Sequence, residues 1–424
     1  DDPTKLNQTM HGVPVKGTLE DIPDLCKRYG IHSIIIAIPT LKGSKLNHVI
    51  DLCVSTHCAV QLLSDPQLVG SGTPQQGAFR ELNPADFLSR DEVTLDTDQI
   101  SGYLTGKTVL VTGGGGSIGS ELCRQVMRFK PGKLLIFDIY ENCAYELLME
   151  LQQKYGRDIP VTVLIGSIRD KKRLDEVFET YHPTVVFHAA AHKHVPLMEV
   201  SPAEAVKNNV LGTKNLLVSA SEHDVERFVQ LSTDKAVNPT SVMGCTTRIC
   251  EMLIQTFAGN TDMKCVAVRF GNVLGSHGSV IPLFEAQIKK GGPVTLTDPN
   301  IERYFMTIPD AAQLVLQAGA LAESGNIYVL DMGEPVKIMD LAKQLIRFYG
   351  YEPGVNMEIK IVGLRPGEKL YEELMMDEEQ DKMRRTQHNK IFVASPRNID
   401  LAQFYEQLQA LEAAAAHNDE GVVK

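Results

Sequence analysis

Three glycines between Lys107 and Ser120 have the spacing of a phosphate-binding turn. An apolar run at residues 108–112 precedes them, and a helical pattern follows. Gly113 permits a tight turn, Gly116 lets backbone amides approach a pyrophosphate, and Gly119 permits close packing of the helix on the strand. A phosphate there would face the positive end of the helix dipole. We therefore expect a dinucleotide at this turn, with Ser117 and Ile118 among its contacts.

A carboxylate follows at the distance that ribose recognition requires. Asp138 ends the next apolar run, 19 residues after Gly119, where such folds bind the adenosine ribose hydroxyls. No Arg or Lys follows it immediately to accept a 2′-phosphate, so the pattern favours NAD over NADP. The alternative is an aspartate that only caps a helix. Ser167 and Ile168 end the third predicted strand and are expected beside the adenine.

Alternating strands and helices must position these residues. The helical patterns lie between apolar, β-branched runs, which predicts a doubly wound parallel sheet of Rossmann type. The runs are residues 108–112, 134–137, 161–165, 184–187, 227–231 and 266–270.

The remaining chain suggests further parts. Residues 1–75 hold helical patterns at 18–29 and 44–56 and strands at 33–38 and 59–63, which predicts a small N-terminal α/β domain. Residues 76–104 are expected to be a connector, following a linker composition at Val69–Gly77. Residues 105–400 would form the catalytic domain, with a small C-terminal substrate-binding part, and residues 401–424 a terminal helix and tail.

Composition excludes several classes of function. The formal charge of −11 argues against nucleic acid as a partner, because such binders carry clustered positive charge. The 8 cysteines show no metal-ligand or C-x-x-C spacing, which indicates buried thiols in a reducing compartment. The apolar stretches are too short to span a bilayer.

Several motifs together resemble the extended short-chain dehydrogenase/reductases. The glycine turn reads Thr-Gly-x-x-Gly-x-x-Gly, and it is accompanied by Asp138, by His188–Ala191 and by Asn209–Thr213. The resemblance covers about residues 105–375. It implies that Ala189, Ala190 and Asn209 also contact the cofactor.

The expected catalytic tyrosine is missing. In this superfamily a Ser or Thr ends the fifth strand and Tyr-x-x-x-Lys follows, but here Met243 stands at the Tyr position. A thioether does not accept a proton at physiological pH. The preceding Thr233-Asp234-Lys235 resembles the nucleotide-sugar 4,6-dehydratases, and the Met resembles their membrane-associated branch, which acts on UDP-N-acetylglucosamine in glycan biosynthesis.

That resemblance implies a redox-neutral loss of water. NAD takes a hydride from C4 of the sugar, water leaves across C5 and C6, and the hydride returns to C6. We assign Lys235 as the base at C5, Asp234 as the acid at C6 and Thr233 as the hydroxyl that orients the C4 oxygen. A neutral Lys235 needs a pKa well below about 10.4, which burial would favour. The alternative is a structural ion pair of Asp234 and Lys235.

One position departs from the family pattern. Thr247 stands where the superfamily carries Lys, four residues after Met243. That Lys normally lowers the pKa of the Tyr and hydrogen-bonds the nicotinamide ribose. Without the phenol the first task disappears, and Thr247 would keep a weaker form of the second.

Nucleotide-sugar recognition is assigned by the same resemblance. Planar Arg side chains bind diphosphate oxygens bidentately. The implied contacts are Asn272, Arg303 and Arg365 at the diphosphate, Glu368 at the uridine ribose, Thr295 and Thr297 at the uracil, and Lys193 in the loop over the sugar. The run His192-Lys193-His194 is not expected to bind a metal, because adjacent side chains do not converge on one ion.

Three interpretations remain open: a retaining dehydratase, an inverting dehydratase, and a catalytically silent NAD-binding protein. The inverting branch typically keeps the Tyr, so Met243 favours the retaining reaction. Because the chain begins at Asp1 without Met, we expect a soluble fragment of a protein tethered at the cytoplasmic face of the membrane. We also expect a homo-oligomer formed through helices of the Rossmann domain.

Overall fold

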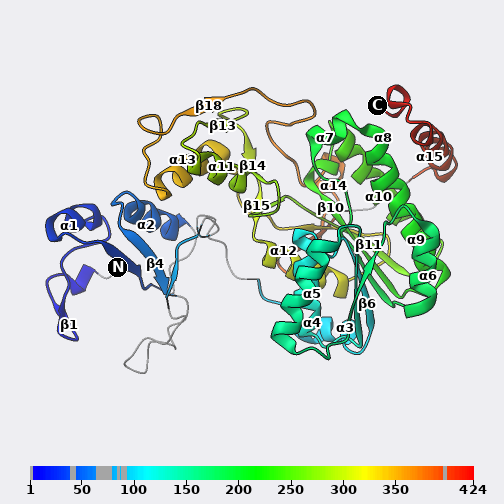
Figure 1. Ribbon diagram of the computed structural model, residues 1–424, viewed down its shortest axis with the longest axis horizontal. Coiled ribbons are helices and arrows are strands. Elements are labelled where there is room, and N and C mark those ends of the chain that lie inside the picture. Colours follow the sequence, from blue (N-terminus) through cyan, green and yellow to red (C-terminus); the bar gives the residue numbers. More distant parts are fainter. Residues whose placement is uncertain (1–2, 39–43, 64–78, 84–85, 87–92, 395–398) are drawn as a thin grey trace. The chain divides into compact units, whose positions relative to one another are not determined.

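The computed structural model describes residues 3–38, 44–63, 79–83, 86, 93–394 and 399–424 (Figure 1). The linker composition at Val69–Gly77 lies outside these residues. Contacts divide the chain into two units, which are described separately. The larger unit comprises residues 93–277, 302–335 and 364–424, and the smaller one comprises residues 1–92, 278–301 and 336–363.

The larger unit is built on a nine-stranded sheet in the order β19-β20-β16-β11-β10-β9-β6-β7-β8. The seven strands from β8 to β16 pair in parallel, and β20 and β19 are antiparallel. This confirms the predicted doubly wound parallel sheet. The strands are β6 (Thr108–Thr112), β7 (Lys133–Asp138), β8 (Val161–Ile165), β9 (Val185–His188), β10 (Arg227–Thr233), β11 (Lys264–Phe270), β16 (Ile327–Leu330), β19 (Arg384–Arg385) and β20 (Ile391–Ala394).

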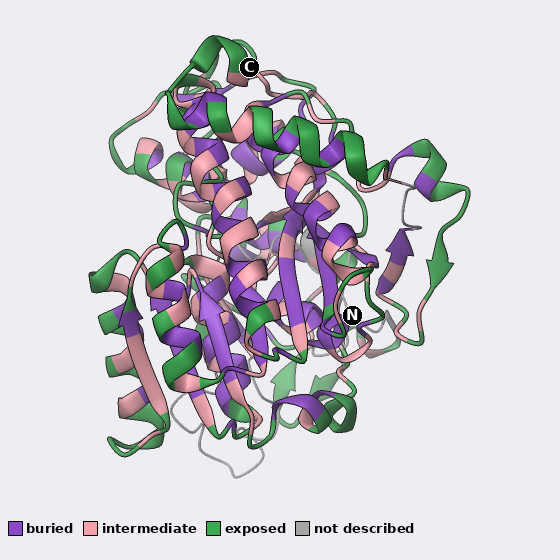
Figure 2. Cartoon of the chain, turned by 90° about the vertical axis from the view of Figure 1, so that its right-hand side faces the viewer, coloured by how far each residue is buried: buried purple, intermediate pink, exposed green. Residues whose placement is uncertain are grey.

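Helices cover both faces of this sheet because its strands are apolar on both sides. Val109 and Val111 of β6 pack into one hydrophobic cluster, whereas Leu110 between them packs into the other. Figure 2 shows the buried residues along the strands and the inner sides of the helices. One cluster includes α3 (Thr97–Leu104), α4 (Ser117–Arg128), α5 (Glu141–Tyr155) and α12 (Ile308–Ala320); the other includes α6 (Lys171–Tyr181), α9 (Gly212–Glu222), α10 (Val242–Ala258) and α15 (Leu401–Ala416).

The strand order reverses between β6 and β9. From β6 the chain moves outward through β7 and β8, and it then returns to place β9 on the other side of β6. At such a switch point the two connections leave in opposite directions, which opens a crevice beyond the carboxyl ends of the strands. The chain forms short helices after the carboxyl ends of two strands. After β9 these are α7 (Val195–Val200), α8 (Pro202–Ala205) and the π-helix η4 (Val206–Leu211), and after β10 it is the 3₁₀ turn η5 (Asp234–Ala236).

The remaining elements of the larger unit are short. They are β12 (Asn272–Val273), which pairs with β15 (Phe305–Met306), and also β14 (Glu302–Arg303), α14 (Asp377–Gln380) and α16 (Glu420–Val423). The predicted terminal helix after Leu401 is present as α15.

The smaller unit contains a three-stranded sheet in the order β3-β4-β5. The pair β3–β4 is parallel, as predicted, and β5 is antiparallel to β4. The predicted helix at 18–29 begins only at Ile22, after a turn in which the Asp21 carboxylate accepts hydrogen bonds from Thr18. Its elements are η1 (Pro3–Lys5), β1 (Thr9–Met10), β2 (Val13–Pro14), α1 (Ile22–Tyr29), β3 (Ser33–Ile36), α2 (Ser44–Val54), β4 (Ala59–Leu63), β5 (Phe79–Glu81), α11 (Val280–Lys289), β13 (Val294–Leu296), β17 (Val336–Lys337), α13 (Ile338–Phe348) and β18 (Ile359–Ile361).

Among the described residues, no helix combines the length and the apolar character that crossing a membrane requires.

Candidate functional site

The glycine turn lies between β6 and α4 and has no room for side chains at two positions. Gly113 has a φ of 67°, and a Cβ there would lie 2.7 Å from the backbone of Ala189 and Ala190. A Cβ on Gly119 would collide with the Gly113 carbonyl oxygen. The helix α4 starts with Gly116 as N-cap, and no described side chain caps it. Its first backbone amides are therefore available for an anion.

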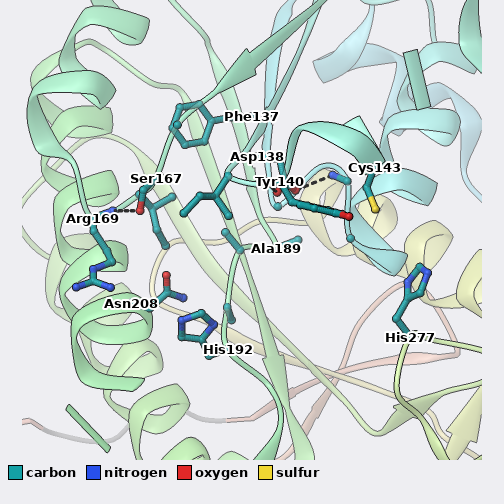
Figure 3. A pocket seen from close by; sticks show the side chains of 18 residues that line it. Phe137, Asp138, Tyr140, Cys143, Ser167, Arg169, Ala189, His192, Asn208 and His277 are labelled. Atoms are coloured by element: carbon teal, nitrogen blue, oxygen red, sulfur yellow. Dashed lines mark hydrogen bonds between the residues drawn. The ribbon is translucent and has the colours of Figure 1, made fainter. Parts of the chain in front are cut away.

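A pocket lies in front of this turn (Figure 3). Seven predicted cofactor residues line it: Gly113, Gly116, Asp138, Ser167, Ile168, Ala189 and Ala190. Ser117 and Ile118 are the first α4 residues, and they lie beside the pocket lining with Gly119. The Ser117 hydroxyl bonds His277, which does line the pocket. The sequence gave no signal for this histidine, because it lies 160 positions along the chain from Ser117.

Asp138 is held at the end of β7 by two backbone amides. Its Oδ2 accepts the Gly115 N–H at 2.8 Å, and its Oδ1 accepts the Tyr140 N–H at 2.9 Å. The N-cap of α5 is Tyr140, and the structure shows no side-chain cap there. The carboxylate therefore ties the glycine turn to the end of β7 and lines the pocket, and it does not cap α5.

Asn209 lies behind the pocket wall instead of lining it. It is buried on the π-helix η4, accepts the His192 N–H at 2.8 Å and donates to the His192 carbonyl at 3.0 Å. Its amide also donates to the Thr246 hydroxyl at 3.0 Å. Asn209 thus fixes the loop after β9, and the adjacent Asn208 lines the pocket. Sequence position alone does not distinguish these two neighbouring asparagines.

Thr233, Asp234 and Lys235 lie together where β10 ends and η5 begins. Asp234 is completely buried, and its Oδ1 accepts hydrogen bonds from the Thr233 hydroxyl at 2.8 Å and from Lys235 Nζ at 2.9 Å. Lys235 Nζ also donates to Asn272 Oδ1 at 3.1 Å. Asp234 Oδ2 is buried with no hydrogen-bond partner within the described structure. Buried polar atoms usually have a partner, so this oxygen is an exception to the rule.

A second buried carboxylate, Glu372, belongs to the same cluster. Its Oε1 lies 3.9 Å from Lys235 Nζ and 4.0 Å from Arg303 Nε. Burial raises the pKa of Glu372, the attraction of Lys235 opposes this, and the charge of Asp234 adds to the increase. The sequence predicted nucleotide contacts at Arg365 and Glu368 nearby, but it gave no signal that distinguishes Glu372 from the exposed Glu373.

Met243 and Thr247 lie on α10, and the structure describes no hydrogen bond from either to Thr233, Asp234 or Lys235. Met243 is 4% exposed and packs in an apolar cluster with Met198 and Ala205. The Thr247 hydroxyl donates to the Met243 carbonyl at 3.1 Å, a bond within its own helix. The apolar surroundings agree with the argument that position 243 provides no acid or base.

A buried ion network lies beside the segment Thr233–Lys235. Glu251 accepts hydrogen bonds from Ser232 at 2.6 Å and from Arg269 at 2.9 and 3.0 Å. Arg269 also donates to Glu379 at 2.7 Å. Burial acts to raise the pKa of Glu251, but the cations of Arg269 and Arg248 together with the hydrogen bonds from Arg269 and Ser232 lower it. The network fixes Ser232, which directly precedes Thr233.

The residues predicted to bind the nucleotide differ from one another in burial. Arg303 is 7% exposed and donates to the carbonyls of Glu302, Lys369 and Leu370 at 2.6–3.1 Å. Its guanidinium therefore holds the segment 364–374. Arg365 is exposed, and its backbone N–H donates to Glu368. Lys193 is exposed in the loop after β9.

Thr295 and Thr297 belong to the smaller unit. Thr295 lies on β13, where its N–H donates to Gln287 Oε1 at 3.0 Å and its hydroxyl accepts from Gln287 Nε2 at 2.7 Å. Thr297 follows directly after this strand. Across the described part of the chain, no group of three or more His, Cys, Asp or Glu side chains is arranged to hold a metal ion.

The parallel sheet, the glycine turn and the pocket at the switch point define a Rossmann-type fold of the extended short-chain dehydrogenase/reductase kind. A solved structure of this kind, Pen from Bacillus thuringiensis, matches 69% of this chain and 89% of its own, with a TM-score of 0.64 and 34% identity. The family model "Polysaccharide biosynthesis protein" matches residues 109–396. The chain belongs to this family.

Two curated relatives are similar over much of the chain. "Capsular polysaccharide biosynthesis protein CapD" of Staphylococcus aureus is 52% identical over 88% of this chain and 63% of its own length. The chain thus spans less than two thirds of that relative. "UDP-N-acetylglucosamine 4,6-dehydratase (inverting)" of Campylobacter jejuni is 34% identical over 63% of this chain and 76% of its own length.

Proposed function

We propose that this chain is an NAD-dependent 4,6-dehydratase that converts UDP-N-acetylglucosamine to its 4-keto-6-deoxy derivative with retention at C5. The observation that carries the proposal is the contact of the buried Asp234 carboxylate with the partly exposed Lys235 ammonium at the carboxyl end of β10. It supplies an acid and a base in one contact, and no tyrosine stands at position 243. The family assignment supports a role in polysaccharide biosynthesis.

The residues around the pocket fit NAD. The glycine turn and the uncapped start of α4 would hold the pyrophosphate, and Asp138 would accept the adenosine ribose hydroxyls. Its negative charge disfavours the 2′-phosphate of NADP. When bound, NAD supplies a reversible oxidation that makes C4 a ketone during the reaction.

The chain's own residues then handle protons. Thr233 would orient the C4 oxygen, and a neutral Lys235 would remove the C5 proton, which a C4 ketone makes acidic. Asp234 would protonate the departing C6 hydroxyl. The Thr233 hydroxyl and Lys235 share Asp234 Oδ1, so the three side chains can exchange protons without moving the backbone.

Nucleotide binding is the second part of the proposal. Arg365 and Asn272 would contact the diphosphate, Glu368 the uridine ribose, Thr295 and Thr297 the uracil, and Lys193 the sugar. Arg303 would act mainly by holding the segment that carries Arg365. The membrane-tethered parent at the cytoplasmic face and the homo-oligomer stay predictions.

An inverting dehydratase is the second candidate. The Campylobacter jejuni relative carries that name, although Met243 of this chain argues for retention. Product analysis by NMR after incubation with UDP-N-acetylglucosamine distinguishes the two by the configuration at C5. Unchanged substrate would support a catalytically silent NAD-binding protein.

Variants test the assigned roles. We expect Asp234→Asn and Lys235→Met each to lower the rate of water loss by at least about 100-fold, the scale of general acid–base catalysis, while NAD still binds. Glu373→Gln, an exposed change nearby, is the control. Near-normal turnover in either cluster variant would contradict the assignment.

A further inference from the structure

The cluster contains one more ionisable group than the proposed mechanism uses. Glu372 is buried beside Lys235, and its Oε2 has no hydrogen-bond partner among the residues that the structure describes. Asp234 Oδ2 is likewise buried and has no hydrogen-bond partner among these residues. Two carboxylates that contact one ammonium therefore each keep one unpartnered oxygen. A purely structural ion cluster would pair these oxygens, because unpartnered buried acceptors destabilise the fold.

The charges around Glu372 limit which group can move a proton. Lys235, Asp234, Arg303 and Lys369 all act on it electrostatically, and Tyr304 lies within the influence of Asp234. Arg303 stays protonated in proteins and donates to backbone carbonyls here. Lys369 is occupied by the Val237 carbonyl and by Glu373. Lys235 Nζ lies 3.9 Å from Glu372 Oε1 and, unlike Arg303, can lose a proton, so it is the ion-pair partner of Glu372 that can exchange one.

The proposed reaction requires Lys235 and Asp234 to be in particular protonation states, and the arrangement of the cluster can supply them. Lys235 must lose a proton before it can act as a base, and Asp234 must hold one before it can act as an acid. Two neighbouring carboxylates do not ionise together easily, so a pair of them tends to share one proton. An ammonium between two such groups can pass protons from one to the other.

We propose that Glu372 takes part in passing protons between Lys235 and Asp234. This inference rests on the proposed dehydration. At the start the Lys235 ammonium lies beside two carboxylates that share one proton, and the reaction proceeds from the form in which Asp234 holds that proton. Lys235 passes its proton to Glu372 and becomes a neutral amine.

Lys235 then takes the C5 proton, and the electron pair of that C–H bond forms the C5–C6 double bond. The C6–O bond breaks, and the departing hydroxyl takes the Asp234 proton to form water. Lys235, again an ammonium, then gives a proton to Asp234 and takes the proton of Glu372, which restores the starting state. In sum one C5 proton leaves with the hydroxyl, and the three side chains are unchanged.

The test is the pH profile of kcat for Glu372→Gln, with Glu373→Gln as the exposed neighbouring control. We expect a flat profile between pH 7 and 9 for the wild type and for the control. In Glu372→Gln the Lys235 proton must leave to solvent, so kcat should fall about 100-fold at pH 7. It should then recover by about tenfold per pH unit as the neutral amine becomes more populated.

Two further variants keep the test decisive if the Gln variant folds poorly. Glu372→Asp keeps a carboxylate, and its profile should stay flat at a lower kcat. Glu372→Ala should regain activity on addition of formate, whereas Glu373→Ala should not respond to it. A merely structural role would lower kcat by the same factor at every pH and give no response to formate.

The outcomes separate this inference from the proposed function. If the wild type forms no 4-keto sugar, the dehydration itself is wrong. If the wild type is active and Glu372→Gln keeps a flat profile, or if formate has no effect on Glu372→Ala, the relay is overturned. Direct exchange between Lys235 and Asp234 would then account for the activity.

Discussion

The carboxylate of Asp138 offers the sharpest test of the dinucleotide site, by its replacement with Asn. In the structure its two oxygens accept the amides of Gly115 and Tyr140 at 2.8 and 2.9 Å. Asparagine keeps one acceptor oxygen, so its NH₂ group must face either one of these amides or the ribose hydroxyls. The lost interaction is a hydrogen bond to a charged group, worth about 1.5–3 kcal/mol. The Kd for NAD should therefore rise about 10- to 100-fold.

The same substitution should act differently on NADP, and this difference is the decisive readout. A 2′-phosphate would meet the negative charge of Asp138, which the Asn variant lacks. We expect the preference for NAD over NADP to fall by at least about tenfold. Calorimetric titration of the apoprotein with both cofactors measures it, and Asp158→Asn, in an exposed turn, is the control. Equal weakening of both cofactors, or an unchanged Kd for NAD, would refute this role of Asp138.

Three further variants test the surroundings of the site. Glu251→Gln breaks a fully buried ion network and should reduce the free energy of unfolding by about 3 kcal/mol, whereas Glu150→Gln, in an exposed pair, should cost under about 1 kcal/mol in urea titrations. Burial lowers the pKa of His188 to about 3 from 6.5, so the unfolded chain binds more protons and stability falls as pH drops from 6.5 towards 3. His188→Gln should remove that contribution of up to about 1.4 kcal/mol per pH unit, which unfolding curves at several pH values would reveal. Asn209→Ala frees the loop after β9 and should weaken NAD binding while leaving the melting temperature within a few degrees; unchanged NAD affinity would contradict this.

The sheet could be predicted because its strands are buried on both faces. β6 has the predicted bounds, since its apolar β-branched run ends at a glycine turn. β10 was predicted to end at Leu231, but the structure continues it to Thr233, where Ser232 and Thr233 pair with β11. A hydrophobic pattern does not detect these polar residues, although they extend the strand to the position of Asp234 and Lys235.

The site was only partly predictable, for a related reason. The glycine turn and Asp138 follow local geometry that sequence spacing encodes, and the structure brings them to one pocket. Glu372 and Asn209 depend on packing between distant segments. Glu372 contacts Lys235 across 137 residues, and Asn209 serves the backbone of the loop beside the pocket. A single sequence records neither contact.

The alternative of a structural ion pair for Asp234 and Lys235 can be weighed from the contacts themselves. A pair that only stabilises the fold should satisfy both carboxylate oxygens, because desolvating a charge costs several kcal/mol unless hydrogen bonds compensate. Asp234 is completely buried, yet its two described donors share Oδ1 and leave Oδ2 unpartnered. Glu372 also has one buried oxygen without a described partner, and its other oxygen lies 3.9 Å from the same ammonium. Two unpartnered acceptors beside one lysine lower the stability of the fold, but they allow proton transfer between these groups. The cluster is therefore better explained by a catalytic role than by a structural one.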